Sequence, residues 1–138
     1  MKIRKPAPSD LSLLARWNHR LIRDEKHRNP MNVRQLGRRM AGWIQAKEYE
    51  VLLFEVDRIA VGYAVFRTAQ DHVYLRQFFV DRKFRRKGSG RKAMEILFTK
   101  VWPKGRPVRL DVLVHNKVAR AFWAAVGFKD YYLGLEKR

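Results

Sequence analysis

The chain has 138 residues, of which 31 are lysine or arginine and 13 are aspartate or glutamate, so its formal charge at pH 7 is +18. It has no cysteine, which excludes disulfides, thiolate metal sites and a cysteine nucleophile, and no apolar run is long enough to span a membrane. We therefore expect a single cytoplasmic domain, residues 1–138, that binds no metal and no membrane. So basic a surface favours nucleic acid, an anionic cofactor or an acidic acceptor as a ligand.

The first part of the chain predicts one short strand and two helices. Residues 2–4 form the strand, and a helix begins after Ser9-Asp10, either of which can cap it. Glu25 lies four residues beyond Leu21, on the apolar face of that helix, so its carboxylate is expected to point inward. A second helix extends from residue 32 to about residue 46.

Three β-rich runs occupy the middle of the chain. Residues 49–56 and 59–67 are joined at Asp57-Arg58, which predicts a hairpin. The third run, residues 73–80, has a nearly continuous apolar end. Such an end indicates a strand that is buried on both faces, in the middle of a sheet.

A basic loop with two glycines follows the third run. Between Arg82 and Lys92 there are seven basic residues and no acidic one. The next helix presents its free N–H groups and the positive end of its dipole to this loop. Gly88 and Gly90 let the backbone curl and let an anion approach closely. The loop therefore predicts a pyrophosphate site.

The remaining elements follow from apolar spacing. Apolar residues recur at helical spacing from Met94 to Val101, which predicts a helix of about three to four turns. Residues 107–114 predict a strand, residues 116–126 a helix and residues 131–135 a final strand.

Two motifs in this order resemble one family. Arg85-x-x-Gly88-x-Gly90 after a strand resembles motif A of the GNAT superfamily of acyl-CoA-dependent N-acyltransferases. Asn116-x-x-Ala119, followed by Phe122-Trp123 and Gly127-Phe128, resembles the second cofactor element of that superfamily. The resemblance covers essentially the whole chain. It implies an α/β, GNAT-type fold with a mixed, mostly antiparallel twisted sheet of about six strands, four flanking helices and a splay in the middle of the sheet at the cofactor site.

The resemblance also assigns contacts with acetyl-CoA as the acyl donor. Backbone groups at the end of the 73–80 strand would pair with the pantetheine arm, and their side chains would fill the core. The basic loop would surround the pyrophosphate, and its charges would also serve the 3′-phosphate. Asn116 would contact the pantetheine arm, although it can equally be a helix N-cap. The cofactor residues so implied are Phe78, Phe79, Val80, Arg85, Arg86, Lys87, Gly88, Ser89, Gly90, Arg91 and Asn116.

The catalytic pattern departs from the family habit at two positions. Trp123 stands where many members have a tyrosine that protonates the departing thiolate, and an indole N–H is no general acid. Arg76 stands where many members have a carboxylate. We therefore take Glu25, Arg76 and Trp123 as candidate catalytic residues on the acceptor side. Weaker candidates are His72 and His115 as bases, and Tyr131 and Tyr132 as proton donors in place of the missing tyrosine.

Three interpretations of the two acceptor-side charges remain open. In the first, Glu25 is the base that takes the proton of the amine. In the second, Arg76 binds an acidic group of the acceptor and deprotonation runs through water. In the third, Arg76 and Glu25 form an ion pair that has only a structural role.

The sequence thus predicts transfer of an acetyl group from acetyl-CoA to a primary amine by direct attack in a ternary complex. The acceptor is a small molecule or a protein, and Arg76 favours one that carries an anionic group. A homodimer is compatible with these features. Two alternatives are a basic nucleic-acid-binding module, which only the +18 charge supports, and a CoA-binding GNAT-like protein without catalysis. Non-specific contact with nucleic acid is compatible with all three readings.

Overall fold

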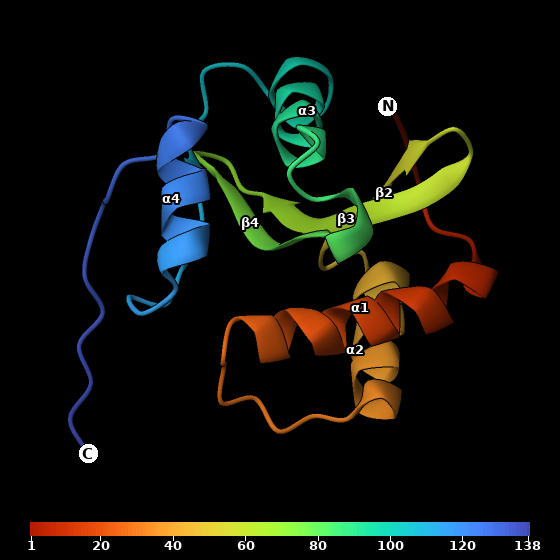
Figure 1. Ribbon diagram of the computed structural model, residues 1–138, viewed down its shortest axis with the longest axis horizontal. Helices are drawn as coiled ribbons and strands as arrows, with labels where there is room; N and C mark the ends of the chain where they lie inside the picture. Colours follow the sequence, from red (N-terminus) through yellow and green to blue (C-terminus); the bar gives the residue numbers. More distant parts are fainter.

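The computed structural model describes residues 1–138 and consists of one sheet with helices on both faces (Figure 1). Five strands lie in the order β1-β2-β3-β4-β5, with antiparallel neighbours except for the parallel pair β4–β5. No helix combines the length and the apolar character that a membrane span needs. The elements are β1 (Lys2–Arg4), η1 (Pro8–Asp10), α1 (Leu11–Asp24), α2 (Val33–Ala46), β2 (Glu50–Val56), β3 (Ile59–Thr68), β4 (Val73–Val80), η2 (Arg82–Phe84), α3 (Ser89–Ile96), η3 (Leu97–Val101, a π-helical turn), β5 (Val108–Arg109) and α4 (Lys117–Ala125).

Each face of the sheet has its own buried core. Helices α1 and α2 cover one face and α3 the other, with α4 beside the β4 edge (Figure 1). Trp17, Tyr63 and Phe79 belong to the core under α1 and α2. Leu75 and Met94 belong to the core under α3, against which α4 also packs. β4 contributes to both cores, as its predicted central position requires.

Helix α2 and the β2–β3 hairpin follow directly from local sequence. Asn32 caps α2: its side chain accepts a hydrogen bond from the Gln35 N–H at 2.9 Å, and the Gln35 side chain accepts one from the Asn32 N–H at 2.9 Å. At Gly37 a Cβ atom would lie 3.3 Å from the Ala15 Cβ, so the glycine lets α1 and α2 pack closely. The hairpin is confirmed, and Asp57-Arg58 turns with φ of 51° and 66°.

The predicted splay of the sheet is confirmed. β5 pairs with β4 only at Val73–Val108 and Tyr74–Arg109. From Leu75 to Val80, β4 has no strand partner on its β5 side. The strand expected over residues 107–114 is therefore wrong in length, since only two residues join the sheet.

A β-bulge places Arg76 beside Gln77 on one face. Val65 pairs with Gln77 and Phe66 with Leu75, so Arg76 is the extra residue in β4. Gln77 accepts a hydrogen bond from the Tyr63 hydroxyl at 2.9 Å, within the core under α1 and α2. The guanidinium of Arg76 lies over rings of that same core.

The final strand expected at residues 131–135 is absent, so the sheet has five strands rather than about six. After α4 the chain continues without helix or strand (Figure 1). Side chains alone connect this segment with the neighbourhood of β5: the Arg109 guanidinium lies 4.9 Å from the Tyr131 ring, and the Tyr132 hydroxyl donates to Asp111 at 2.9 Å. Leu135 is 93% exposed, so little apolar burial offsets the entropy cost of ordering a strand.

Candidate active site

The three residues expected on the acceptor side line one cavity. Glu25, Arg76 and Trp123 enclose about 30 Å³, room for about one water, at the point where the sheet splays. Gln77 and Asp111 also line this cavity, and we call it the inner cavity. Residues from α1, β4, the segment after β5 and α4 thus meet in one place.

Glu25 has the environment of a general base. It follows the last residue of α1 and is half-buried. Burial, and then the neighbouring charge of Asp24, raises the pKa of the Glu25 carboxyl. Glu25 joins no ion pair in the chain, so the interpretation of a structural Arg76–Glu25 pair is wrong.

Trp123 is an apolar wall of the inner cavity. Its ring centroid lies 5.6 Å from Phe78, 4.9 Å from Phe122 and 5.2 Å from Phe128. These edge-to-face contacts hold the indole against the core under α3. Trp123 shapes the site and has no acidic proton to give.

The phenols of Tyr74 and Tyr132 are poor substitutes for the missing acid. The Tyr74 hydroxyl donates to Asp111 at 2.8 Å, and burial and then this hydrogen bond raise its pKa to about 12. The bond to Asp111 also raises the pKa of Tyr132. Phenols with raised pKa values are poor proton donors near neutral pH. His72 contacts Asp71 at 2.7 Å outside the inner cavity, and His115 Nε2 contacts the Glu25 carbonyl oxygen at 3.0 Å.

The start of α3 is arranged to hold an anion. Gly88 precedes the helix with φ of 76°, Arg86 has φ of 62°, and no side chain caps the helix. The first helical hydrogen bond runs from the Lys92 N–H to the Gly88 carbonyl at 3.0 Å. No loop carbonyl or side chain accepts from the preceding N–H groups of Ser89, Gly90 and Arg91. They and the helix dipole favour a phosphate at this position.

Some cationic side chains of the loop form no ion pair, whereas others are bonded to Asp24. Arg86 and Lys87 are exposed and join no ion pair. Arg85, by contrast, donates to the Val80 carbonyl at 2.6 Å and to Asp24 at 3.2 Å. Asp24 also accepts from Arg82 at 2.6 Å. Arg85, predicted as a phosphate ligand, therefore connects the end of β4 with α1 in this structure.

Arg91 and Asn116 each make one hydrogen bond with α4. Arg91 donates to the Ala125 carbonyl at 3.4 Å, at the end of α4. Asn116 Oδ1 accepts from the Ala119 N–H at 3.1 Å, so the N-cap reading of this residue is confirmed. Its Nδ2 group is left to donate to a cofactor.

Gly88 and Gly90 each need to be glycine, but for different physical reasons. A Cβ at Gly88 would meet nothing within 4 Å, but the positive φ disfavours any larger residue. A Cβ at Gly90 would lie 3.0 Å from Phe122 Cε1. The absence of a side chain at Gly90 thus also lets α3 pack closely on Phe122 of α4, and its predicted role in admitting an anion stays a prediction.

The side chains at the end of β4 are packed, as expected. Phe79 is 1% exposed and packs against both Trp17 and Tyr63, with ring centroids at 5.6 Å and 5.9 Å. Phe78 is half-buried and stacks on Phe122, with centroids 5.9 Å apart. Together with Val80, these residues can offer a ligand their backbone on the open side of β4.

Sequence reasoning missed a polar cluster next to the inner cavity. Asn18 is fully buried on the apolar face of α1, and its Oδ1 accepts from Arg39 at 3.5 Å. The Arg39 guanidinium lies 4.6 Å from the Trp43 ring centroid, and the Arg76 guanidinium 4.8 Å from it. An asparagine within an apolar helical stripe was the available signal.

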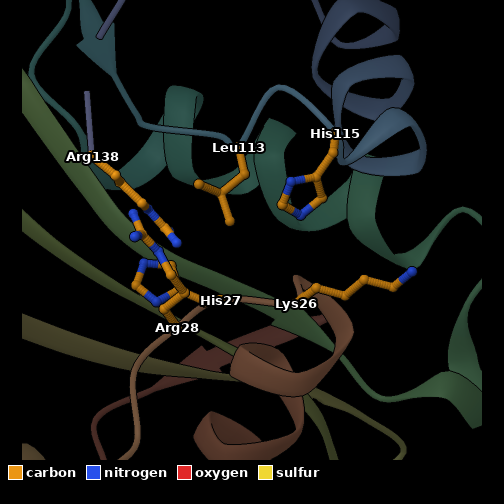
Figure 2. A pocket seen from close by; sticks show the side chains of 6 residues that line it. All are labelled: Lys26, His27, Arg28, Leu113, His115 and Arg138. Carbon is orange, nitrogen blue, oxygen red and sulfur yellow. The ribbon is translucent and has the colours of Figure 1, made fainter. Parts of the chain in front are cut away.

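A second, larger cavity opens near the inner one. It has a volume of about 330 Å³ and is lined by Leu113 and by basic or imidazole side chains: Lys26, His27, Arg28, His115 and Arg138. Figure 2 shows Leu113 and His115 on one side of this outer cavity, with His27 and Arg28 on the other and the Lys26 amine extending away. His115, which lines the outer cavity, contacts the carbonyl oxygen of Glu25, which lines the inner one, so the two cavities have neighbouring walls.

Comparison with known proteins identifies the family. A family model described as the acetyltransferase (GNAT) family matches residues 13–128. Among curated proteins there is no match.

Solved structures with the same fold include enzymes of several kinds. A possible acetyltransferase from Clostridium difficile 630 has a TM-score of 0.76 and 16% identity, covering 99% of this chain and 95% of its own. An aminoglycoside N-acetyltransferase in complex with CoA has a TM-score of 0.75 and 17% identity, covering 99% and 93%. A ribosomal-protein-alanine N-acetyltransferase from Brucella melitensis has a TM-score of 0.74 and 15% identity, covering 100% and 99%. At these identities the likeness concerns the fold alone.

Proposed function

Because the chain belongs to the acetyltransferase (GNAT) family, we propose that it transfers an acetyl group from acetyl-CoA to a primary amine by direct attack in a ternary complex. The observation that carries this proposal is the inner cavity, where a half-buried carboxylate lies beside the open edge of β4. A donor on that edge and an acceptor at Glu25 would meet there.

The residues present fit a CoA thioester. The unpaired half of β4 offers backbone groups to an amide-containing arm, and Asn116 Nδ2 can add one donor. The uncapped start of α3 and the free cations Arg86 and Lys87 offer hydrogen bonds and charge to a pyrophosphate. Acetyl-CoA, when bound, supplies an activated carbonyl carbon and a thiolate leaving group.

Glu25 would make the amine nucleophilic. A primary amine is mostly protonated near neutral pH, and its cation cannot attack a carbonyl carbon. Because burial raises the pKa of Glu25, its carboxylate is a stronger base than an exposed one. Glu25 takes one proton from the ammonium group, and the neutral nitrogen forms the new C–N bond. The C–S bond breaks with its electron pair leaving on sulfur, and the nitrogen gives its second proton to that thiolate or to water.

The departing thiolate needs no dedicated acid. A thiol has a pKa of about 8.5, so its anion is a tolerable leaving group near neutral pH. The proton that Glu25 has taken can reach the thiolate or the solvent through water in the inner cavity. Trp123 contributes an apolar wall that limits access of bulk water.

The test is Glu25→Gln, with Glu48→Gln, an exposed residue without an ion pair, as the matched control. We expect Glu25→Gln to lower kcat by about 10²-fold or more, with an unchanged Kd for CoA by calorimetry. Wild-type kcat/KM should fall as the pH drops through the raised pKa of Glu25, and the variant should lose this limb.

Three results would contradict the proposal. The first is a chain that does not bind CoA. The second is an acetyl group that stays attached to the protein after incubation with labelled acetyl-CoA alone, since that indicates an acyl-enzyme. The third is CoA binding without thiol release for any member of a broad panel of amines, which would favour the non-catalytic alternative.

A further inference from the structure

We propose that the acceptor is a small amine that carries a carboxylate or phosphate group, and that Arg39 and Arg76 bind this group beside Trp43. The inference rests on the proposed function and names its substrate class. It extends the single-residue expectation for Arg76, on β4, to a site that also includes Arg39 and Trp43 of α2, Tyr49 just before β2, and the buried Asn18 on the apolar face of α1.

The two guanidiniums share one aromatic ring. The Arg39 Cζ lies 4.6 Å from the Trp43 centroid and the Arg76 Cζ 4.8 Å from it. Arg76 Nη1 also donates to the Tyr49 hydroxyl at 3.3 Å. The Arg67 Cζ lies 5.3 Å from the centroid of the Tyr49 ring. The rings hold the planar groups in place while leaving their N–H edges able to donate.

No protein anion neutralises this cluster. Neither Arg39, Arg67 nor Arg76 forms an ion pair with a carboxylate. Arg67 and Arg76 are exposed and Arg39 is half-buried, so water screens part of their mutual repulsion, yet three like charges gathered around Trp43 and Tyr49 still cost stability when no anion is bound. Burial, and then the charge of Arg76, lowers the pKa of Arg39, as expected of a cation that lacks a counterion.

Two buried donors also lack an acceptor. Arg39 Nε and Asn18 Nδ2 are inaccessible to solvent and make no hydrogen bond, although Asn18 is fully buried. Trp102 Nε1, in the core under α3, is the third such donor of the chain, but only Asn18 and Arg39 lie together. Buried polar groups are nearly always satisfied, so two unsatisfied donors in one place favour a missing partner. The two residues are already joined by one hydrogen bond, from the Arg39 guanidinium to Asn18 Oδ1. An acceptor-only ligand such as a carboxylate or a phosphate matches this set of donors.

The cluster is positioned next to the proposed base. Arg76 lines the inner cavity together with Glu25. A ligand whose anionic group is held by Arg76 can therefore present its amine to Glu25 without a long spacer. Asp111 lines the same cavity but is engaged by the hydroxyls of Tyr74 and Tyr132.

The surface beside the inner cavity is cationic as well. The wall of the outer cavity touches that of the inner one where His115 contacts the Glu25 carbonyl, and Lys26 and Arg28 also line the outer cavity. Arg28 is partly neutralised by Glu136, at 2.7 Å. Lys26 has no ion pair, so the surface beside the inner cavity retains a positive charge that attracts anions.

A small acceptor fits better than a nucleic acid. A single strand needs an extended basic groove with aromatic faces for stacking along its length. Here the faces of Trp43 and Tyr49 are already covered by arginines, and the cluster adjoins a cavity of about 30 Å³. The outer cavity, about 330 Å³, has the size of a small-molecule site.

The first experiment compares amines that differ only in the anionic group. Ornithine against putrescine tests a carboxylate, and phosphoethanolamine against ethanolamine tests a phosphate. We expect at least one anionic member to have a kcat/KM about tenfold or more above that of its neutral or cationic counterpart. Arg76→Gln and Arg39→Gln should remove this preference through KM. Arg38→Gln, the exposed neighbour of Arg39 on α2, should keep it.

The second experiment measures anion binding without turnover. The chain is saturated with CoA, so that the α3 loop is occupied, and inorganic phosphate or acetate is titrated while the arginine Nε–H resonances are followed by NMR. We expect a saturable shift of the Arg39 Nε–H signal, identified by its loss in Arg39→Gln. The shift should be absent in Arg76→Gln. Thermal unfolding of each variant checks that it is folded.

The outcomes separate the two proposals. Failure to bind CoA overturns the proposed function. CoA binding with no anion-dependent shift, or a preference for putrescine and ethanolamine, overturns this inference alone. An anion-dependent shift without transfer to any amine supports the anion site and overturns the transferase. Oligonucleotide binding that displaces phosphate from Arg39 would assign the site to nucleic acid and overturn the small-amine class.

Discussion

Asp24 is expected to restrain the cofactor loop. Its carboxylate accepts from Arg82 at 2.6 Å and from Arg85 at 3.2 Å, across about sixty residues of sequence. A pyrophosphate that uses these guanidiniums must take them from Asp24. The Asp24→Asn variant removes the competing charge and keeps the shape, so it should bind CoA more tightly than the wild type.

The expected gain is modest because the pairs are exposed to water. The Arg82 side chain is 72% exposed, the Arg85 side chain 39% and the Asp24 side chain 22%. Such pairs contribute about 0.5 kcal/mol each. Breaking both therefore costs about 1 kcal/mol, which corresponds to about a fivefold lower Kd for CoA in Asp24→Asn.

Calorimetric titration with CoA measures this change at low and at high salt. Glu95→Gln is the matched control, because Glu95 is an exposed acid of α3 without an ion pair, and its loss changes the net charge equally. The gain in Asp24→Asn should exceed that in Glu95→Gln and should shrink at high salt. Equal gains in the two variants, or weaker CoA binding in Asp24→Asn, would refute the reasoning. Weaker binding would mean that the Asp24–Arg85 contact organises the site.

Two further predictions concern stability. Because burial raises the folded-state pKa of Glu25 above its unfolded value, the stability of the wild type should fall as the pH rises between those two values; Glu25→Gln should therefore have a higher Tm than the wild type at pH 8 but not at pH 4, by calorimetry. Substitution of Gly88 and of Gly90 by alanine should have different effects. Gly88→Ala should cost about 1 kcal/mol of backbone strain and weaken CoA binding in a folded protein, whereas Gly90→Ala should lower the Tm through its contact with Phe122 and should recover with Phe122→Leu. A Tm of Gly90→Ala equal to that of the wild type would contradict the packing argument.

The features that the sequence determined by itself depend on neighbouring residues. The capping box of Asn32 and Gln35, the Asp57-Arg58 turn and the N-cap of Asn116 each close a hydrogen bond or a turn within three residues. The glycine-rich loop before α3 belongs to the same class, because Gly88 supplies the positive φ that begins the helix. Glu25 also follows from sequence, since helical spacing places it on the buried face of α1. Local geometry of this kind is independent of how the sheet is assembled.

Tertiary structure alone decided the details of the acceptor side. The bulge that turns Arg76 and Gln77 to one face depends on the register of β3 with β4, although two adjacent polar residues in an apolar strand marked the place. The placement of Arg76 beside Arg39 joins β4 to α2 through the Trp43 ring. Such contacts between distant segments exist only after the cores have packed.

Residues 131–135 and Gly90 are two cases in which local sequence and tertiary packing lead to different conclusions. Residues 131–135 have the composition of a strand, yet they remain outside the sheet, because β5 pairs for only two residues and leaves no ladder to extend. Gly90 matches a cofactor motif, yet its missing side chain is also required by Phe122 of α4. Pattern identifies which residues matter, whereas the packing of distant segments decides what each residue touches and therefore why it is needed.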